Sequence, residues 1–200
     1  MAGPNGTALL DDFNRANSSS LGGNWTADPF GFGLSSLQIA SNQCVPASDT
    51  YGANSWGAGS FTADMEAYMT VATNPSNNVR LLCRLSNVGT SSVCGYSLIV
   101  ASAGVDLYRI DNQSLTFLLN VAGVPSAGDK WAISCVGSTI SAYRDHGSGW
   151  GFLFSQNDAT YPTGSRIGLY SQANSALALD DFGGGSIVSG YVKTGSGVIG

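Results

Sequence analysis

The chain has 200 residues, of which only 10% are charged and 27 are glycine, and its formal net charge is −5. A negative charge without any cluster of Lys and Arg argues against nucleic acid as a partner. No apolar run approaches the roughly 18 to 20 residues needed to span a bilayer, so membrane insertion is not expected. The length suits one all-β domain, and the many Gly, Ser, Thr and Asn residues favour turns over helices.

The tripeptide Asp-Asp-Phe occurs near both ends of the chain, at residues 11–13 and 180–182, each time after a short run of Ala and Leu. Successive side chains of a strand point to opposite faces, so each phenylalanine shares a face with the first aspartate of its tripeptide. We predict that the two segments are adjacent terminal strands, with Phe13 and Phe182 in the core.

Asp11 and Asp180 would then lie at the rim of that core. A carboxylate at such a position needs a partner, because burying an unpaired charge is costly. Arg15, backbone N–H groups or a structural calcium ion held by Asp11 and Asp180 would each serve.

Strand patterns run almost without a break from residue 57 onward. Short apolar runs separated by Gly, Asn and Ser predict a sandwich or barrel, and no window has a helical period. The glycine run at 183–186 lacks the lysine and helix of a phosphate loop and is predicted to be a turn. The predicted strands cover residues 61–71, 79–85, 93–100, 105–110, 115–121, 131–136, 139–143 and 166–170, followed by the closing strand.

The four cysteines, Cys44, Cys83, Cys94 and Cys135, have no metal-ligand spacing. Two interpretations stay open. Cys83 and Cys94 lie in consecutive predicted strands and could pair across them, or all four could be small buried thiols.

The opening of the chain, residues 10–17 followed by 21–26, resembles that of laminin G-like jelly rolls in the concanavalin A-like lectin and glucanase superfamily. The resemblance spans roughly residues 8–187 and implies an all-β, antiparallel jelly-roll β-sandwich, with residues 1–187 as a single domain. Similar openings are frequent in structural proteins of bacteriophage virions. Later segments in the same order and spacing are 79–84, 96–98, 130–136, 140–143, 166–170 and 176–182.

Glucanases of this superfamily carry two glutamates flanking an aspartate on one strand, and retaining hydrolysis needs two carboxyl groups about 5 Å apart. Only Asp64 and Glu66 approach that pattern, and Glu66 is the single glutamate of the chain. We predict that both are outward polar residues of a half-buried strand. The chain has a single histidine and no nucleophile elbow, so we predict no enzymatic activity.

Aromatic rings in loops stack on the faces of sugars and lose little entropy on binding. Tyr51 and Trp56 flank a short polar segment, and Trp150 lies between two glycines close to His146. We therefore predict that Tyr51, Trp56, His146 and Trp150 form a carbohydrate-binding site in loops of the sandwich.

Residues 188–200 have isolated apolar side chains in a Gly/Ser background. A tail of this composition is expected to dock on a neighbouring subunit by adding to a sheet edge, or to contribute a further strand to its own domain.

These observations predict a non-enzymatic virion structural protein of a bacteriophage, either a head decoration or a minor tail subunit. It would contact other virion subunits as a homo-oligomer and host cell-surface glycans through weak, multivalent contacts. The first seven residues lack the basic and apolar parts of a secretory signal, so we expect assembly in the host cytoplasm and release by lysis. The alternative is an extracellular carbohydrate-binding module of a polysaccharide-degrading enzyme.

Overall fold

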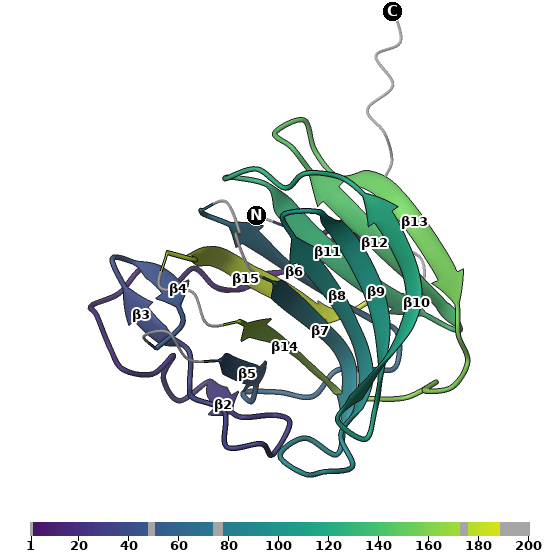
Figure 1. Ribbon diagram of the computed structural model, residues 1–200, viewed down its shortest axis with the longest axis horizontal. Helices are drawn as coiled ribbons and strands as arrows, with labels where there is room; N and C mark the ends of the chain where they lie inside the picture. Colours follow the sequence, from purple (N-terminus) through teal and green to yellow (C-terminus); the bar gives the residue numbers. More distant parts are fainter. Residues whose placement is uncertain (1, 48–50, 74–77, 173–175, 189–200) are drawn as a thin grey trace, which may run out of the picture.

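The computed structural model describes residues 2–47, 51–73, 78–172 and 176–188, which form a sandwich of two antiparallel sheets (Figure 1). In these ranges no helix is long and apolar enough to cross a membrane. The strands are β1 (Leu9–Asp11), β2 (Trp25–Ala27), β3 (Gln38–Ala40), β4 (Gln43–Val45), β5 (Gly52–Trp56), β6 (Met65–Val71), β7 (Val79–Ser86), β8 (Cys94–Ala101), β9 (Gly104–Asp111), β10 (Ser114–Ala122), β11 (Lys130–Val136), β12 (Thr139–Asp145), β13 (Gly151–Asn157), β14 (Arg166–Ser171) and β15 (Leu179–Ser186).

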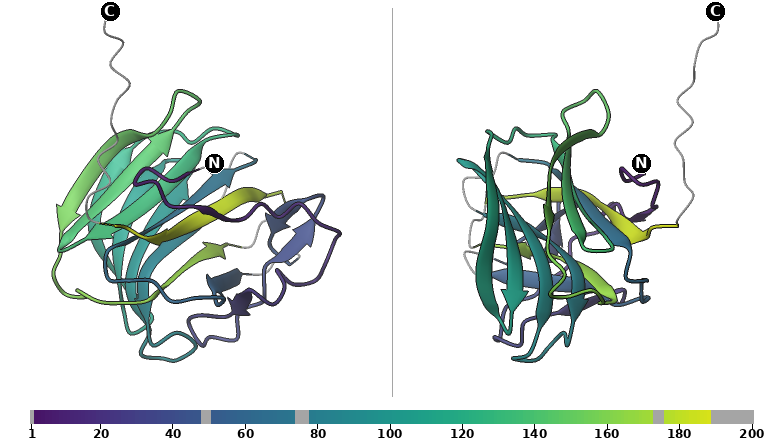
Figure 2. Two further views of the ribbon diagram at one scale, coloured as in Figure 1. Left: turned by 180° about the vertical axis from the view of Figure 1, so that it is seen from behind. Right: turned by 90° about the vertical axis from the view of Figure 1, so that its right-hand side faces the viewer.

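The two sheets lie face to face, as the edge-on view in the right panel of Figure 2 shows. The eight-stranded sheet has the order β13-β12-β11-β6-β15-β4-β3, with β1 also paired to β15. The seven-stranded sheet has the order β10-β9-β8-β7-β14-β5-β2. The predicted all-β, antiparallel jelly-roll sandwich is confirmed.

The core fills the space between the sheets because alternate residues of each strand point inward. In β6 the inward residues are Met65, Ala67, Met69 and Val71, all fully buried. The two terminal strands meet as predicted: β1 pairs with β15, and Asp11 lies opposite Phe182. Phe13 and Phe182 are both fully buried in this core, which confirms their predicted place.

Glu66 differs from its prediction as an outward polar residue. It does point to the outer face of the eight-stranded sheet, but its side chain is fully buried under residues 2–8. Its carboxylate accepts hydrogen bonds from Asn5 N, Asn5 Nδ2 (2.7 Å), Thr7 N and Thr7 Oγ1 (2.6 Å). A Cβ at Gly3 would lie 2.3 Å from a Glu66 oxygen, so only glycine lets this segment approach so closely. In Figure 2, left, the segment crosses in front of β15.

The prediction of a turn at 183–186 is wrong, because β15 continues to Ser186, which pairs with Met65. The glycines are required there by close neighbours. A Cβ at Gly183 would lie 2.1 Å from the Tyr68 ring, and one at Gly184 would lie 2.2 Å from the backbone oxygen of Glu66. The sandwich therefore includes the glycine run, whereas the tail predicted to dock, residues 188–200, lies outside the described residues from 189 onward.

All four cysteines are buried free thiols, as one of the two interpretations predicted, and no bond joins Cys83 to Cys94. Burial raises the pKa of the Cys44 and Cys83 thiols above the ordinary value. The thiols pack as small apolar groups and are unreactive in the folded protein.

An arginine of β9 fastens the loop after β13 to the seven-stranded sheet. Arg109 Nε donates to Asp111 Oδ1 at 2.8 Å, and Nη1 donates to Asp158 Oδ2 at 2.8 Å. Tyr161 Oη also donates to Asp111, at 2.8 Å. The hydrogen bond from Arg109 outweighs partial burial and lowers the pKa of Asp111 to about 2.

This lowered pKa predicts a stability loss in acid. A carboxyl whose pKa is depressed in the folded state stabilises the protein above its unfolded pKa of about 3.9, and this stabilisation is lost as pH falls through the folded pKa. Between pH 4 and pH 2 we expect the wild type to lose more free energy of unfolding than the Asp111→Asn variant, measured by urea titration. The matched control is Asp106→Asn on the same strand, whose side chain binds Asn120. Identical slopes for wild type and Asp111→Asn would contradict the role of this pair.

Candidate functional site

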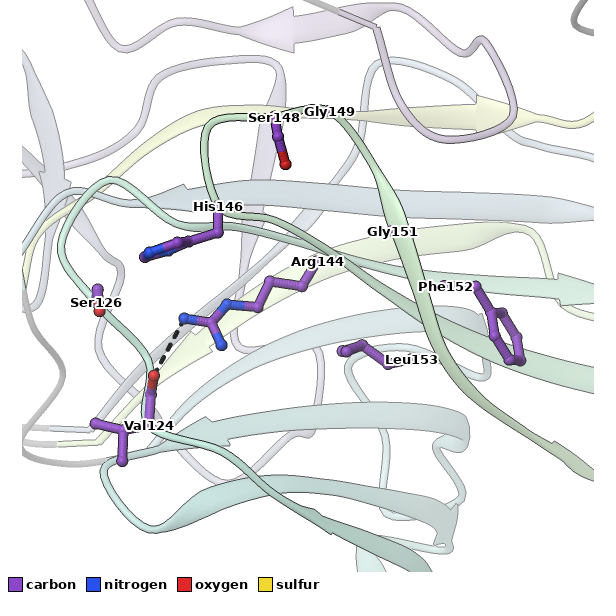
Figure 3. Close-up of a pocket in the computed structure, with 9 residues that line it drawn as sticks. All are labelled: Val124, Ser126, Arg144, His146, Ser148, Gly149, Gly151, Phe152 and Leu153. Atoms are coloured by element: carbon purple, nitrogen blue, oxygen red, sulfur yellow. Dashed lines mark hydrogen bonds between the residues drawn. The ribbon is translucent and has the colours of Figure 1, made fainter.

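A hollow of about 470 Å³ lies where the β10–β11 connection passes from one sheet to the other, beside the tip of the β12–β13 hairpin (Figure 3). It contains one of the predicted site residues, His146. The residues that line it are Val124, Ser126, Arg144, His146, Ser148, Gly149, Gly151, Phe152 and Leu153.

The tip of the hairpin is shaped by a buried aspartate at the end of β12. Asp145 Oδ1 accepts hydrogen bonds from the backbone N–H groups of Gly147 and Gly149, both at 2.8 Å. These glycines have φ of +91° and +98°, a backbone conformation that favours glycine. The turn presents His146 and Ser148 to the hollow.

The charge on Asp145 is maintained by the same contacts. Burial raises the pKa of its carboxyl, but the hydrogen bonds from Gly149 and Gly147 and the charge of Lys130 outweigh burial and hold it below the ordinary value. Lys130 Nζ lies 3.7 Å from Asp145 Oδ2. An ionised acceptor makes stronger hydrogen bonds, so the loop is held more firmly.

A second buried aspartate organises the walls of the hollow. Asp129, whose side chain is 1% exposed, accepts from Ser126 N at 2.7 Å and from Arg144 Nη2 at 2.5 Å, and it contacts His146 Nδ1. Arg144 also donates to Val124 O at 3.1 Å. The Asp129 carboxylate thus fixes the β10–β11 connection, strand β12 and the tip of the β12–β13 hairpin relative to one another.

The arrangement combines polar groups with an apolar wall. The His146 side chain is 67% exposed and is oriented through Nδ1, so its other ring nitrogen is left for a ligand. Val124 and Leu153 supply the apolar wall, whereas the ring of Phe152, 61% exposed, lies on the other side of β13 and meets Tyr143 edge-on at 5.8 Å (Figure 3). Hydroxyl groups come from Ser126 and Ser148 (Figure 3). Such a surface suits a small polar molecule that also presents a flat apolar face.

The four predicted carbohydrate-binding residues do not come together. Trp150 follows His146 in the hairpin, but its ring lies over Tyr68 and its Nε1 donates to Ala2 O at 2.9 Å. Tyr51 is half exposed and lies beside Tyr170 of the seven-stranded sheet.

The prediction for Trp56 is wrong. The polar segment that it flanks with Tyr51 predicts a loop, but Trp56 ends β5 and is only 7% exposed. Its partner in the register is Trp25 on β2, and their rings meet at 5.3 Å. A core tryptophan has no free face for a sugar.

Sequence reasoning missed several residues of the hollow, above all Asp129, Arg144 and Phe152. Asp129 precedes a predicted strand and looks like an ordinary turn residue. The alternation of β12 places Arg144 on the inner face, where the guanidinium packs over the Trp131 ring at 4.9 Å. The pattern Gly-Phe-Leu-Phe at 151–154 is a strand signal that identifies Phe152 as a candidate outward residue.

At the predicted calcium position, Asp11 binds Arg15, the first of the partners considered. Arg15 Nη1 and Nη2 donate to Asp11 Oδ1 (2.6 Å) and Oδ2 (3.0 Å), and Trp25 Nε1 donates to Oδ2 at 2.7 Å. Burial and the nearby carboxylates Asp181 and Asp12 raise the pKa of Asp180. Within the described ranges no three His, Cys, Asp or Glu residues come together to hold a metal ion. These contacts fit an arginine clamp at Asp11.

No family model and no curated protein sequence matches the chain, but solved structures share its architecture. The carbohydrate-binding module CBM66 from Bacillus subtilis superposes with a TM-score of 0.58 at 15% identity, covering 82% of this chain and 94% of that one. The VIP36 exoplasmic/lumenal domain bound to Ca²⁺ and Man3GlcNAc gives 0.62 at 10% identity, covering 92% of each chain. The fold is a concanavalin A-like jelly roll. The metal-free Emp46p carbohydrate recognition domain has the same concanavalin A-like fold, with a TM-score of 0.61 at 11% identity, covering 88% of this chain and 95% of that one.

The two tryptophans on which the binding prediction depended should behave differently when they are truncated. Trp56→Ala removes a buried ring and should lower the free energy of unfolding by about 3–5 kcal/mol. Trp150→Ala removes one hydrogen bond and a partly exposed ring contact, so we expect a loss of about 1 kcal/mol. Denaturant unfolding measures both, and an equal loss for the two variants would contradict the assignment of Trp56 to the core.

Proposed function

We propose that the chain is a non-enzymatic carbohydrate-binding domain that holds a sugar in the hollow beside His146. The observation that carries the proposal is the grouping of exposed His146 with Ser126 and Ser148 around an open hollow. Sugars present hydroxyl groups at their edges and C–H groups on their faces; the serines offer hydroxyls, and the His146 ring and Leu153 offer contact to the C–H face. The neighbours named as a carbohydrate-binding module and as a carbohydrate recognition domain support the class of ligand.

The absence of catalysis is part of this proposal. Glycoside hydrolysis commonly needs an acid and a second carboxylate beside the bond that is cleaved. Glu66 is buried, and its oxygens accept hydrogen bonds from Asn5 and Thr7. In the hollow itself, Asp129 is buried and bound by Arg144, and Asp145 is engaged in shaping the turn. These carboxylates serve structural roles.

The virion setting and the homo-oligomer stay predictions. The virion setting is supported by a chain poor in Lys and Glu and rich in Gly, a composition suited to proteins that work outside cells. The alternative, a module of a polysaccharide-degrading enzyme, is supported by the likeness to CBM66. Sugar binding by the hollow is common to both settings.

A glycan array with the unmutated protein identifies the sugar, and calorimetry then measures the variants. His146→Ala and Ser148→Ala should each weaken binding at least about tenfold, equivalent to about 1.4 kcal/mol. Phe117→Ala is the matched control, because this ring is also exposed but lies on β10 of the other sheet. The unmutated protein should release no reducing sugar from the bound glycan. Failure to bind any glycan, or full affinity in both hollow variants, would overturn the proposal.

A further inference from the structure

A second hollow, of about 240 Å³, lies on the outer face of the seven-stranded sheet. Arg80 of β7 and Tyr170 of β14 are paired across this sheet. Their chain neighbours Val79, Leu81 and Leu169 point into the core, so Arg80 and Tyr170 point outward. Residues that line the hollow include Phe30, Phe32, Arg80, Gln113, Leu115 and Tyr170.

Arg80 has no carboxylate partner in the described part of the chain, unlike most of the other arginines. Arg15, Arg109 and Arg144 each bind an aspartate. The Arg80 guanidinium instead lies over the ring of Tyr170, 4.2 Å from its centroid, and Nε is buried without an acceptor in the described part of the chain. Burial lowers the pKa of Arg80, although nearby tyrosines counteract this effect. A guanidinium stays charged at neutral pH, so this cation is desolvated without compensation by a carboxylate.

The aromatic wall beside Arg80 is held in place before any ligand arrives. Phe30 and Phe32 stack at 6.2 Å with an interplanar angle of 12°. Asp28 accepts from Phe32 N at 3.2 Å and from Gly33 N at 2.6 Å, which closes the turn. Gln113 Nε2 donates to Phe30 O at 2.6 Å and ties this turn to the sheet. Phe32 is nevertheless 57% exposed, so its ring is available for stacking.

We propose that this hollow binds a carboxylate-bearing sugar ring, such as a uronic acid, with the carboxylate on Arg80 and the ring face against Phe32. The planar N–H fork of arginine matches the two oxygens of a carboxylate. Aromatic walls favour a ring over a bare ion. Among the described residues that line the hollow, Arg80 is the single cation, which suits one negative charge better than a doubly charged phosphate. This hollow lies on the seven-stranded sheet, apart from the hollow at His146, and takes a different class of sugar.

The test uses calorimetry on the full chain with a galacturonic acid trisaccharide and its carboxyl-reduced, neutral counterpart. The wild type should bind the acidic sugar at least tenfold more tightly than the neutral one, and added salt should weaken the binding. Arg80→Gln should abolish this preference, and Arg80→Lys should restore only part of it. Phe32→Ser keeps the charge of Arg80 but removes an exposed ring, and it should also weaken binding. This variant tests the proposal even if Arg80→Gln does not fold.

Two controls separate this site from general effects. Arg166→Gln removes the same charge from β14, where the guanidinium donates to Gly59 O, and should leave binding unchanged. His146→Ala should also leave it unchanged, so the two hollows are tested independently. Equal affinity for the acidic and the neutral sugar, or full affinity in both Arg80→Gln and Phe32→Ser, would overturn the proposal. A dimer of the wild type that Arg80→Gln abolishes would overturn it as well, because the occupant would then be a second copy of the chain.

Discussion

The buried carboxylate of Glu66 is the constraint on which the outer face of the eight-stranded sheet depends. A charge buried on the central strand β6 must be satisfied by donors, and Asn5 and Thr7 supply them. The segment of residues 2–8 is therefore fixed across the sheet, where Ala2 O accepts the hydrogen bond of the Trp150 indole. Trp150 directly follows Gly149, which lines the hollow at His146. A chain of contacts thus runs from a structural carboxylate to the proposed sugar site.

Three aspartates hold other parts of the structure in place. Asp11 clamps the first strand through Arg15 and Trp25, Asp145 shapes the hairpin tip, and Asp129 joins the walls of the hollow. Burying a carboxylate costs free energy of folding unless hydrogen-bond donors or a cation pair with it, and each of these three aspartates has such donors. Since these carboxylates are committed to structure, the hollow at His146 is lined by rings and hydroxyls beside one arginine.

Much of the fold could be predicted from alternation alone, whereas the site depends on contacts between distant residues. Strands such as β7, β8 and β11 have regular apolar patterns, and the repeated Asp-Asp-Phe correctly indicated that β1 and β15 are neighbours. The glycine run of β15 looked like a turn because Tyr68, which requires it, is more than a hundred residues away. The prediction for Trp56 is wrong for a similar reason, because the local sequence does not show that Trp25 is its partner on the neighbouring strand. His146 was identified, but its alignment by Asp129 is a tertiary contact.

The link from Glu66 to the hollow can be measured by hydrogen exchange of the backbone amides. In the Glu66→Ala variant, residues 2–8 should lose protection, and the hairpin at residues 146–150 should lose protection with them. Strands β8 and β9 should keep theirs, because they lie in the other, seven-stranded sheet. Unchanged protection of both residues 2–8 and the hairpin would contradict the account.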